Sequence, residues 1–179
     1  MSSKVNILPI IGDHFSTLRN ASTNRISISD LLTQLGIPLL AAALAIWPRQ
    51  LDLSNTYGNI TAALAIVFGF SFAVTVFVFQ LRMQMAEMQI SSEQRTVAAI
   101  APQIDTRAPG LVNELFKNCL YAVVLSGFST LFASIIEPFA LGRIGDVILV
   151  AVACHLLLVL MMCFKRLHAA YARVSSLAT

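Results

Sequence analysis

The chain has 179 residues, of which 57% are hydrophobic and 12% are charged, whereas a soluble domain has about 45–50% apolar and about 25% charged residues. The net charge is only +3 and the three cysteines show no paired spacing, which argues against a nucleic-acid binder, a disulfide scaffold and a zinc site. We therefore expect a lipid bilayer to surround most of the chain, with the cysteines as small apolar fillers.

Four segments have the roughly 17–25 largely apolar residues of a membrane-spanning helix. They are Leu31–Trp47, Ile60–Gln80, Cys119–Ile136 and Ile144–Phe164, and none has a charge in its central two turns. The predicted fold is an all-α membrane protein with four transmembrane helices. The chain then divides into an N-terminal segment, a first helix pair, a helical hairpin, a second helix pair and a basic tail, at residues 1–30, 31–80, 81–118, 119–164 and 165–179.

The distribution of basic residues predicts the orientation. Ten of the 12 Lys and Arg residues lie in the N-terminal segment, the middle connection or the C-terminal tail, and only Arg49 and Arg143 lie in the two other connections. Because basic residues concentrate on the cytoplasmic side of membrane proteins, we expect both termini and the hairpin to face the cytoplasm.

The first two spans carry residues that affect helix geometry and packing. Pro38 predicts that the first span is kinked or begins as a separate short helix. In the second span, Ala65, Gly69 and Ala73 place small residues on one helical face, so that another helix can approach closely.

The third span has a line of hydroxyl groups on Ser126, Thr130 and Ser134. Each hydroxyl can bond to the carbonyl four residues earlier or to a neighbouring helix. The alternative is a polar stripe that lines a pore or cavity.

The second span is predicted to continue as one helix into the cytoplasm. There is no Gly or Pro from Leu81 to Ala101, a length of about 30 Å at 1.5 Å per residue. Pro102, Pro109 and Gly110 are expected to break the chain. Leu111–Asn118 is then a shorter helical lead of roughly 12 Å into the third span. The upper part of the longer arm therefore has no obvious partner within the chain.

Apolar side chains recur on this arm with the spacing of a coiled-coil seam. One strip includes Met83, Ile90 and Val97, and a neighbouring strip includes Leu81, Met85 and Met88. The arm either packs on the 111–118 segment and the C-terminal extension, or meets other copies or a soluble partner through its adaptable methionines.

Two ionisable side chains are candidates for a functional site. His155 lies near the centre of the fourth span, where an ionisable group marks a functional site unless it is a neutral imidazole bonded to a Ser or Thr of the third span. Glu137, in the connection before that span, forms a local salt bridge or a ring at the mouth of an oligomeric cation pore. No phosphate loop, metal-ligand cluster or carboxylate pair is present, so we expect neither enzymatic activity nor a cofactor.

Two stretches, "HFSTLRNASTNRISISDLLTQLGIPLL" and "LVNELFKNCLYAVVLSG", resemble a pattern in small bacterial multi-pass proteins found near anti-phage defence genes, of which the membrane subunit of the Kiwa system is one type. The resemblance implies four spans, a soluble partner and a role in phage defence.

Together these features predict a homo-oligomeric protein of the bacterial inner membrane that acts as a membrane sensor or a membrane-disrupting effector. It would act on a soluble cytoplasmic protein through its cytoplasmic helices. The alternative is an ion-conducting channel or small transporter without a defence role.

Overall fold

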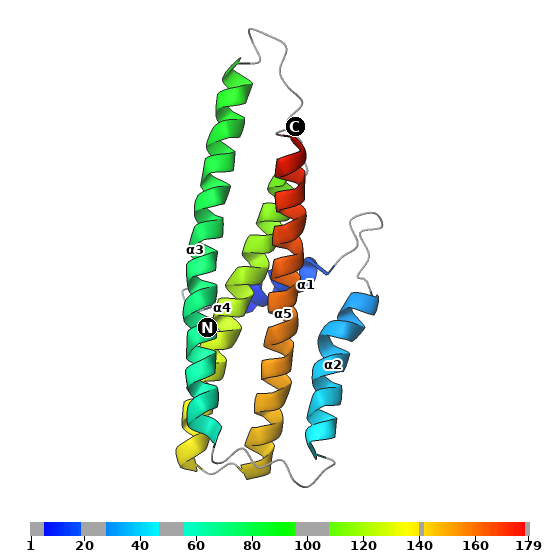
Figure 1. The fold of residues 1–179 in the computed structure, drawn as a ribbon, viewed down its shortest axis with the longest axis vertical. Helices are drawn as coiled ribbons and strands as arrows, with labels where there is room; N and C mark the ends of the chain where they lie inside the picture. The colour runs from blue at the N-terminus through cyan, green and yellow to red at the C-terminus, as the bar shows by residue number, and fades with distance from the viewer. Residues whose placement is uncertain (1–5, 19–27, 47–55, 96–107, 140–141, 178–179) are drawn as a thin grey trace.

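The computed structural model describes residues 6–18, 28–46, 56–95, 108–139 and 142–177, and every regular element in these ranges is helical. Figure 1 shows the five helices in chain order, α1 (Leu8–Ser16), α2 (Ile28–Ile46), α3 (Tyr57–Arg95), α4 (Ala108–Phe139) and α5 (Gly142–Leu177). The short α1, which begins next to Pro9, was not predicted from the sequence. The expected all-α class is confirmed.

Three helices of the described ranges are long and apolar enough to cross a membrane. These segments are Tyr57–Glu87 in α3, Gly110–Ile135 in α4 and Ile144–Ala172 in α5. Helix α2 contributes a shorter apolar segment, Ile28–Leu44. The second, third and fourth predicted spans thus correspond to helices of sufficient length, whereas a fourth crossing by α2 and the direction of all the spans stay predictions.

The long helices continue through the boundaries predicted between membrane and cytoplasmic segments. Helix α3 runs without a break from the second span to Arg95, which confirms the helical arm up to that residue. Helices α4 and α5 pass in the same way through residues 118 and 164. Helix α2 is continuous across Pro38, so the prediction of a separate short helix before the proline is wrong.

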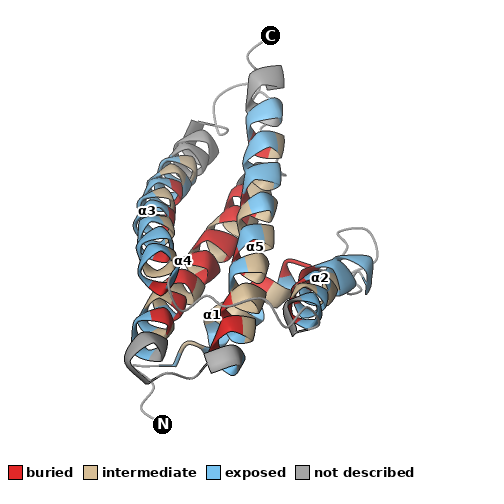
Figure 2. Ribbon diagram, turned by 60° about the horizontal axis from the view of Figure 1, so that its bottom comes forward, coloured by how far each residue is buried: buried red, intermediate tan, exposed pale blue. Residues whose placement is uncertain are grey.

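Helix α4 is the centre of the molecule. Helix α3 packs against it along one side and α5 along another, α2 packs on α5, and α1 lies across α4. Buried residues gather on α4, while α3 and α5 present exposed faces outward (Figure 2). The core therefore follows α4, and the outward faces carry large apolar side chains such as Phe72, Phe77 and Met161, as expected for helices in contact with lipid.

The face that α3 turns toward α4 follows a strict spacing of three and four residues. Its buried or partly buried members are Leu64, Val67, Ser71, Val74, Val78, Leu81 and Met85. Such spacing keeps one stripe of a helix against its antiparallel neighbour. Met85, in the second predicted strip of the arm, therefore packs within the chain, whereas Met83, in the first strip, is 48% exposed.

Two contacts fix the register between α3 and α4. A Cβ atom on Gly127 would lie 3.1 Å from the Phe68 ring, so glycine permits this close approach. Nearer the polar ends of the helices, the rings of Phe79 and Phe116 lie 6.1 Å apart. A separation of eleven residues on α3 thus matches a separation of eleven residues on α4.

This register leaves the end of α3 beyond the start of α4. Continued along both helices, it places Ala108 opposite Glu87, so that residues 88–95 project about 12 Å further at 1.5 Å per residue. Figure 1 shows this projection at the top of α3. Met88 and Ile90 belong to it, but their side chains lie outside the described part of the structure, and Val97 lies outside the described residues altogether.

The small-residue stripe of α3 does not face α4. Ala65, Gly69 and Ala73 are exposed, and a Cβ atom added to Gly69 would meet no atom within 4 Å. Close packing of a second helix on this stripe stays a prediction, and within the described residues no helix of the same chain occupies it.

Candidate functional site

Helix α1 is attached to α4 by buried polar groups. The ring of His14 is fully buried, and its Nδ1 lies 2.9 Å from Oδ1 of Asn118, which is also fully buried. The Thr17 hydroxyl lies 3.0 Å from the same Oδ1 and 2.7 Å from the carbonyl of His14. Because an amide oxygen only accepts, Nδ1 of His14 carries the hydrogen of this contact.

The buried His14 ring also stacks on Tyr121, one turn further along α4. The ring centroids are 4.0 Å apart and the planes are within 7° of parallel. The Tyr121 hydroxyl then reaches α5, where it lies 3.0 Å from Nε2 of His155. The side chain of Tyr121 thus contacts α1 through the face of its ring and α5 through its hydroxyl.

His155 continues the chain of contacts to α2. Its Nδ1 donates to the backbone carbonyl of Gln34 at 3.0 Å, and since a carbonyl can only accept, Nε2 of the neutral ring accepts from Tyr121. In a regular helix the Gln34 carbonyl would accept from the N–H of residue 38, but Pro38 has no N–H. His155 therefore satisfies a carbonyl that the proline leaves without its helical partner, which is one of the ways in which an apolar helix tolerates a proline.

Arg166 of α5 closes the cluster at its polar end. Its Nη1 lies 2.9 Å from Oε2 of Glu114 on α4, and its Nη2 donates to the Thr17 carbonyl at the end of α1 over 2.7 Å. A second ion pair joins Lys117 to Asp13 at 3.1 Å. A cation beside the C-terminal carbonyls of a helix stabilises that end of the helix. Arg166 therefore stabilises the C-terminal end of α1 and connects it to α4 and α5.

We define the polar cluster by the residues that make these contacts, namely His14, Thr17, Gln34, Glu114, Asn118, Tyr121, His155 and Arg166. It joins four helices, and most of its contacts are hydrogen bonds between buried polar groups, which are usually paired in folded proteins. Some hydrogen-bonding capacity remains, because Nε2 of His14 and Nδ2 of Asn118 are buried and have no partner among the described residues. The contacts of the polar cluster hold α1, α2, α4 and α5 in place relative to one another.

Only His155 of the polar cluster was identified from the sequence. The interpretation as a hydrogen-bonded interior histidine is confirmed, but its partner on the third span is Tyr121 and not Ser or Thr. Of the remaining members, Gln34 and Tyr121 fall inside predicted spans. The others lie in the polar segments that precede or follow the spans. One signal in the sequence could have indicated the contact of His155 with α2. Pro38 has no N–H, so the carbonyl of Gln34, four residues earlier, needs a donor from outside its own helix.

The hydroxyl line of α4 bonds to its own helix. Ser126 donates to the carbonyl of Ala122 at 2.7 Å, Thr130 to that of Ser126 at 2.8 Å and Ser134 to that of Thr130 at 3.0 Å. Ser126 is fully buried, whereas Ser134 is exposed. The interpretation as local hydrogen bonds is confirmed, and His155 does not join this line.

The other end of the bundle has one described polar contact between helices. The Tyr57 hydroxyl of α3 donates to the buried carboxylate of Asp146 on α5. Glu137 lies in the last turn of α4, but its side chain is outside the described part of the structure, as is that of Arg143. The predicted salt bridge and the predicted ring of Glu137 are therefore both left as predictions.

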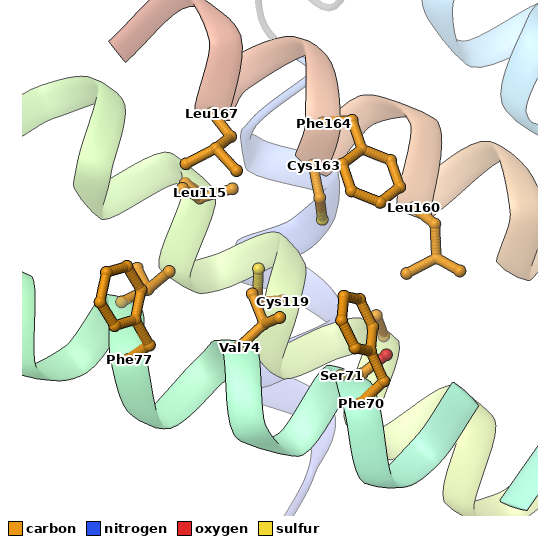
Figure 3. Close-up of a pocket in the computed structure, with 12 residues that line it drawn as sticks. Phe70, Ser71, Val74, Phe77, Leu115, Cys119, Leu160, Cys163, Phe164 and Leu167 are labelled. Atoms are coloured by element: carbon orange, nitrogen blue, oxygen red, sulfur yellow. The ribbon is translucent and has the colours of Figure 1, made fainter. Parts of the chain in front are cut away.

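A cavity of about 140 Å³ lies between α3, α4 and α5. Figure 3 shows Cys119 and Cys163 directed toward it together with Phe70, Phe77 and other apolar side chains. Both cysteines are buried free thiols, in line with their expected place among apolar neighbours. The lining of this space is almost entirely apolar, so it suits apolar groups.

The environment of His14 predicts that α1 binds less tightly in acid. Burial, above all, lowers the pKa of His14 from 6.5 to about 4, with smaller contributions from His155 and Arg166, while the hydrogen bond to Asn118 acts in the opposite direction. A histidine whose pKa is lower in the docked state favours docking fully above pH 6.5. We expect that contribution to be lost as the pH falls from 6.5 toward 4.

A spin label at Ser16, which is exposed at the end of α1, measures this effect. Its mobility should rise as the pH is lowered from 7.5 to 5. The His14→Gln variant keeps a hydrogen-bond donor for Asn118 but has no titrating ring, so its spectrum should change much less. An equal change in both proteins would show that another group titrates.

Among the described residues, no group of three or more His, Cys, Asp and Glu side chains is placed to hold a metal ion. Comparisons with protein family models, with curated proteins and with solved structures find no match to this chain.

Proposed function

We propose that this protein spans a membrane and couples the arrangement of its membrane helices to a soluble partner bound at their polar end. The observation that carries this proposal is the continuity of α3, which is one helix from its apolar segment to Arg95 and extends past the start of α4. A rigid helix passes a rotation or shift in the membrane directly to its other end. The projecting end is then the natural place for a partner.

In this proposal, helix α1 also changes position, between a docked and a released state. It has nine residues, too few for a stable isolated helix in water, so its structure depends on docking. The contacts of His14 and Thr17 with Asn118, and of Arg166 with Thr17, tie that docking to the positions of α4 and α5. A change between the membrane helices would therefore alter whether α1 is held or released.

The biological setting follows from the resemblance and not from the geometry. We propose a homo-oligomer in the bacterial inner membrane, with both termini in the cytoplasm, that acts as a sensor or effector in phage defence. In support, the two stretches that carry the resemblance contain six members of the polar cluster, all except His155 and Arg166. The experiment for this setting is phage challenge of cells with and without the gene and its neighbours.

The channel alternative rests on the hydroxyl line of α4 and on Glu137 and His155. The hydroxyls of Ser126, Thr130 and Ser134 are engaged with the carbonyls of α4 itself, and the cavity between α3, α4 and α5 has an apolar lining. The channel alternative therefore stays a prediction, and we propose the coupling function because the continuity of α3 supports it.

The methionines of α3 test whether the exposed strip that leads to the projecting end contributes to assembly or partner binding. Met83→Asp places a charge on an exposed position, whereas Met85→Asp places one against the hydrophobic core. We expect Met83→Asp to change stability by less than about 0.5 kcal/mol, as is usual for surface sites, and to reduce assembly or partner binding. Met85→Asp should destabilise the fold by about 2 kcal/mol or more, because it buries a charge.

Thermal unfolding of the detergent-purified protein measures stability, and native mass spectrometry measures the assembly and any co-purifying soluble protein. Gln84→Asp, at the neighbouring exposed position, is the matched control for added charge. The proposed surface would be wrong if Met83→Asp leaves both the mass of the assembly and the co-purifying protein unchanged.

A further inference from the structure

A polar groove lies between α1, α3 and α4, on the side of α4 away from the apolar cavity. It has a volume of about 340 Å³, and the charged and polar side chains in its lining are Asp13, Arg82, Asn113 and Lys117. Phe116 and Ile10 supply apolar surface beside them. Three separate helices therefore contribute to one concave site that lies outside the polar cluster.

The groove lies where the long apolar segments of α3 and α4 end. From Tyr57 along α3, Arg82 is the first charged residue, and from Lys117 along α4, no charged residue follows before Glu137. The contact of Arg82 with the Phe116 ring, 5.7 Å from its centroid, shows that the two boundaries are side by side. The groove is thus placed where lipid headgroups meet the protein.

The charges of the groove favour an anion. Arg82 and Lys117 are positive and only Asp13 is negative; Asp13 pairs with Lys117 at 3.1 Å. Arg82 is exposed and makes no ion pair among the described residues, since its one described partner is the face of Phe116. Its guanidinium hydrogens remain available, and their planar geometry suits the two free oxygens of a phosphodiester.

The surroundings favour a lipid over a soluble anion. Phe79 is half exposed on α3, and its ring lies 6.1 Å from that of Phe116, so an apolar wall continues from the groove toward the membrane interior. An acyl chain can follow this wall while its headgroup occupies the groove. Basic pockets between membrane helices bind anionic headgroups in this manner.

We propose that the groove binds the phosphodiester headgroup of an anionic phospholipid, with Arg82, Lys117 and Asn113 as donors. Asp13 competes with the lipid for Lys117. Binding therefore weakens the Asp13–Lys117 ion pair, and lipid composition affects how α1 is held.

The test is a titration of the full-length, detergent-purified protein with phosphatidylglycerol or phosphatidylcholine, followed by native mass spectrometry. We expect phosphatidylglycerol to bind more tightly. Arg82→Gln and Lys117→Gln should each weaken its binding about fivefold, since one basic residue near an anionic lipid contributes about this factor. Lys165→Gln, at an exposed position of α5, should change the affinity for phosphatidylglycerol less than twofold.

Asp13→Asn separates binding from a structural effect on α1. It breaks the same ion pair as Lys117→Gln, but it removes a competing carboxylate and should tighten the binding of phosphatidylglycerol. The proposal is overturned if Asp13→Asn weakens binding, if Arg82→Gln has no effect, or if Lys165→Gln is as harmful as Arg82→Gln. It is also overturned if inorganic phosphate binds as tightly as phosphatidylglycerol, because the site would then recognise a soluble anion.

Discussion

Replacement of His155 by Leu is expected to destabilise the folded protein by about 2 kcal/mol, because the substitution leaves a buried carbonyl without a donor. That carbonyl belongs to Gln34, and Pro38 prevents its helical hydrogen bond. The hydroxyl of Tyr121 loses its acceptor in the same variant. Reversible unfolding in mixed micelles measures the free energy change.

The proline provides the decisive control. In a Pro38→Ala background the N–H of residue 38 satisfies the Gln34 carbonyl, so His155→Leu should cost about 1 kcal/mol less than in the natural sequence, in line with one interhelical hydrogen bond in a membrane. His168→Leu, at an exposed position of α5, should have little effect. Equal costs of His155→Leu in both backgrounds would disprove the link between Pro38 and His155.

The second large effect is expected for Asn118→Leu. The Asn118 side chain is fully buried and accepts from His14 and Thr17. Leu has a similar size but no acceptor, and a buried donor left without a partner costs about 1–3 kcal/mol. We expect the docking equilibrium of α1 to fall about tenfold or more, measured as faster hydrogen exchange of residues 8–16.

A paired substitution distinguishes a lost hydrogen bond from a packing defect. Replacing both partners by apolar groups is much less costly than removing one, so His14→Phe combined with Asn118→Leu should recover a large part of the protection of α1. Asn59→Leu, at an exposed position of α3, controls for the added apolar surface. Protection that stays as low in the double variant as in Asn118→Leu would show that the hydrogen bond is not what holds α1.

The long apolar helices and the continuous arm were predictable because they depend on local features of the sequence. A long apolar run, or the absence of Gly and Pro between Leu81 and Arg95, acts over neighbouring residues and can be read directly. The same local reasoning failed for Met83 and Met85, since two apolar strips of similar spacing compete on one helix. Only the position of α4 determines which strip is buried.

The polar cluster was largely unpredictable because its contacts join distant segments. His14 and Asn118 are 104 residues apart, and His155 and Gln34 are 121 residues apart. Nothing in the neighbourhood of His14 indicates that its ring is buried against Tyr121. A histidine and an asparagine in polar helix ends are indistinguishable from solvated residues until the helices that cover them are placed.

The pairing of the Gln34 carbonyl with His155 has a consequence for biogenesis. Helix α2 is synthesised well before α5, yet α5 is the neighbour on which it packs and the source of the donor that its carbonyl requires. In the proposed topology, the Gln34 carbonyl of α2 stays without its donor during translation until α5 has been inserted. In the same topology, α2 therefore gains its native partner only after α3, α4 and α5 have been synthesised, and a chain truncated before α5 would expose the unpaired carbonyl to the quality-control proteases of the membrane.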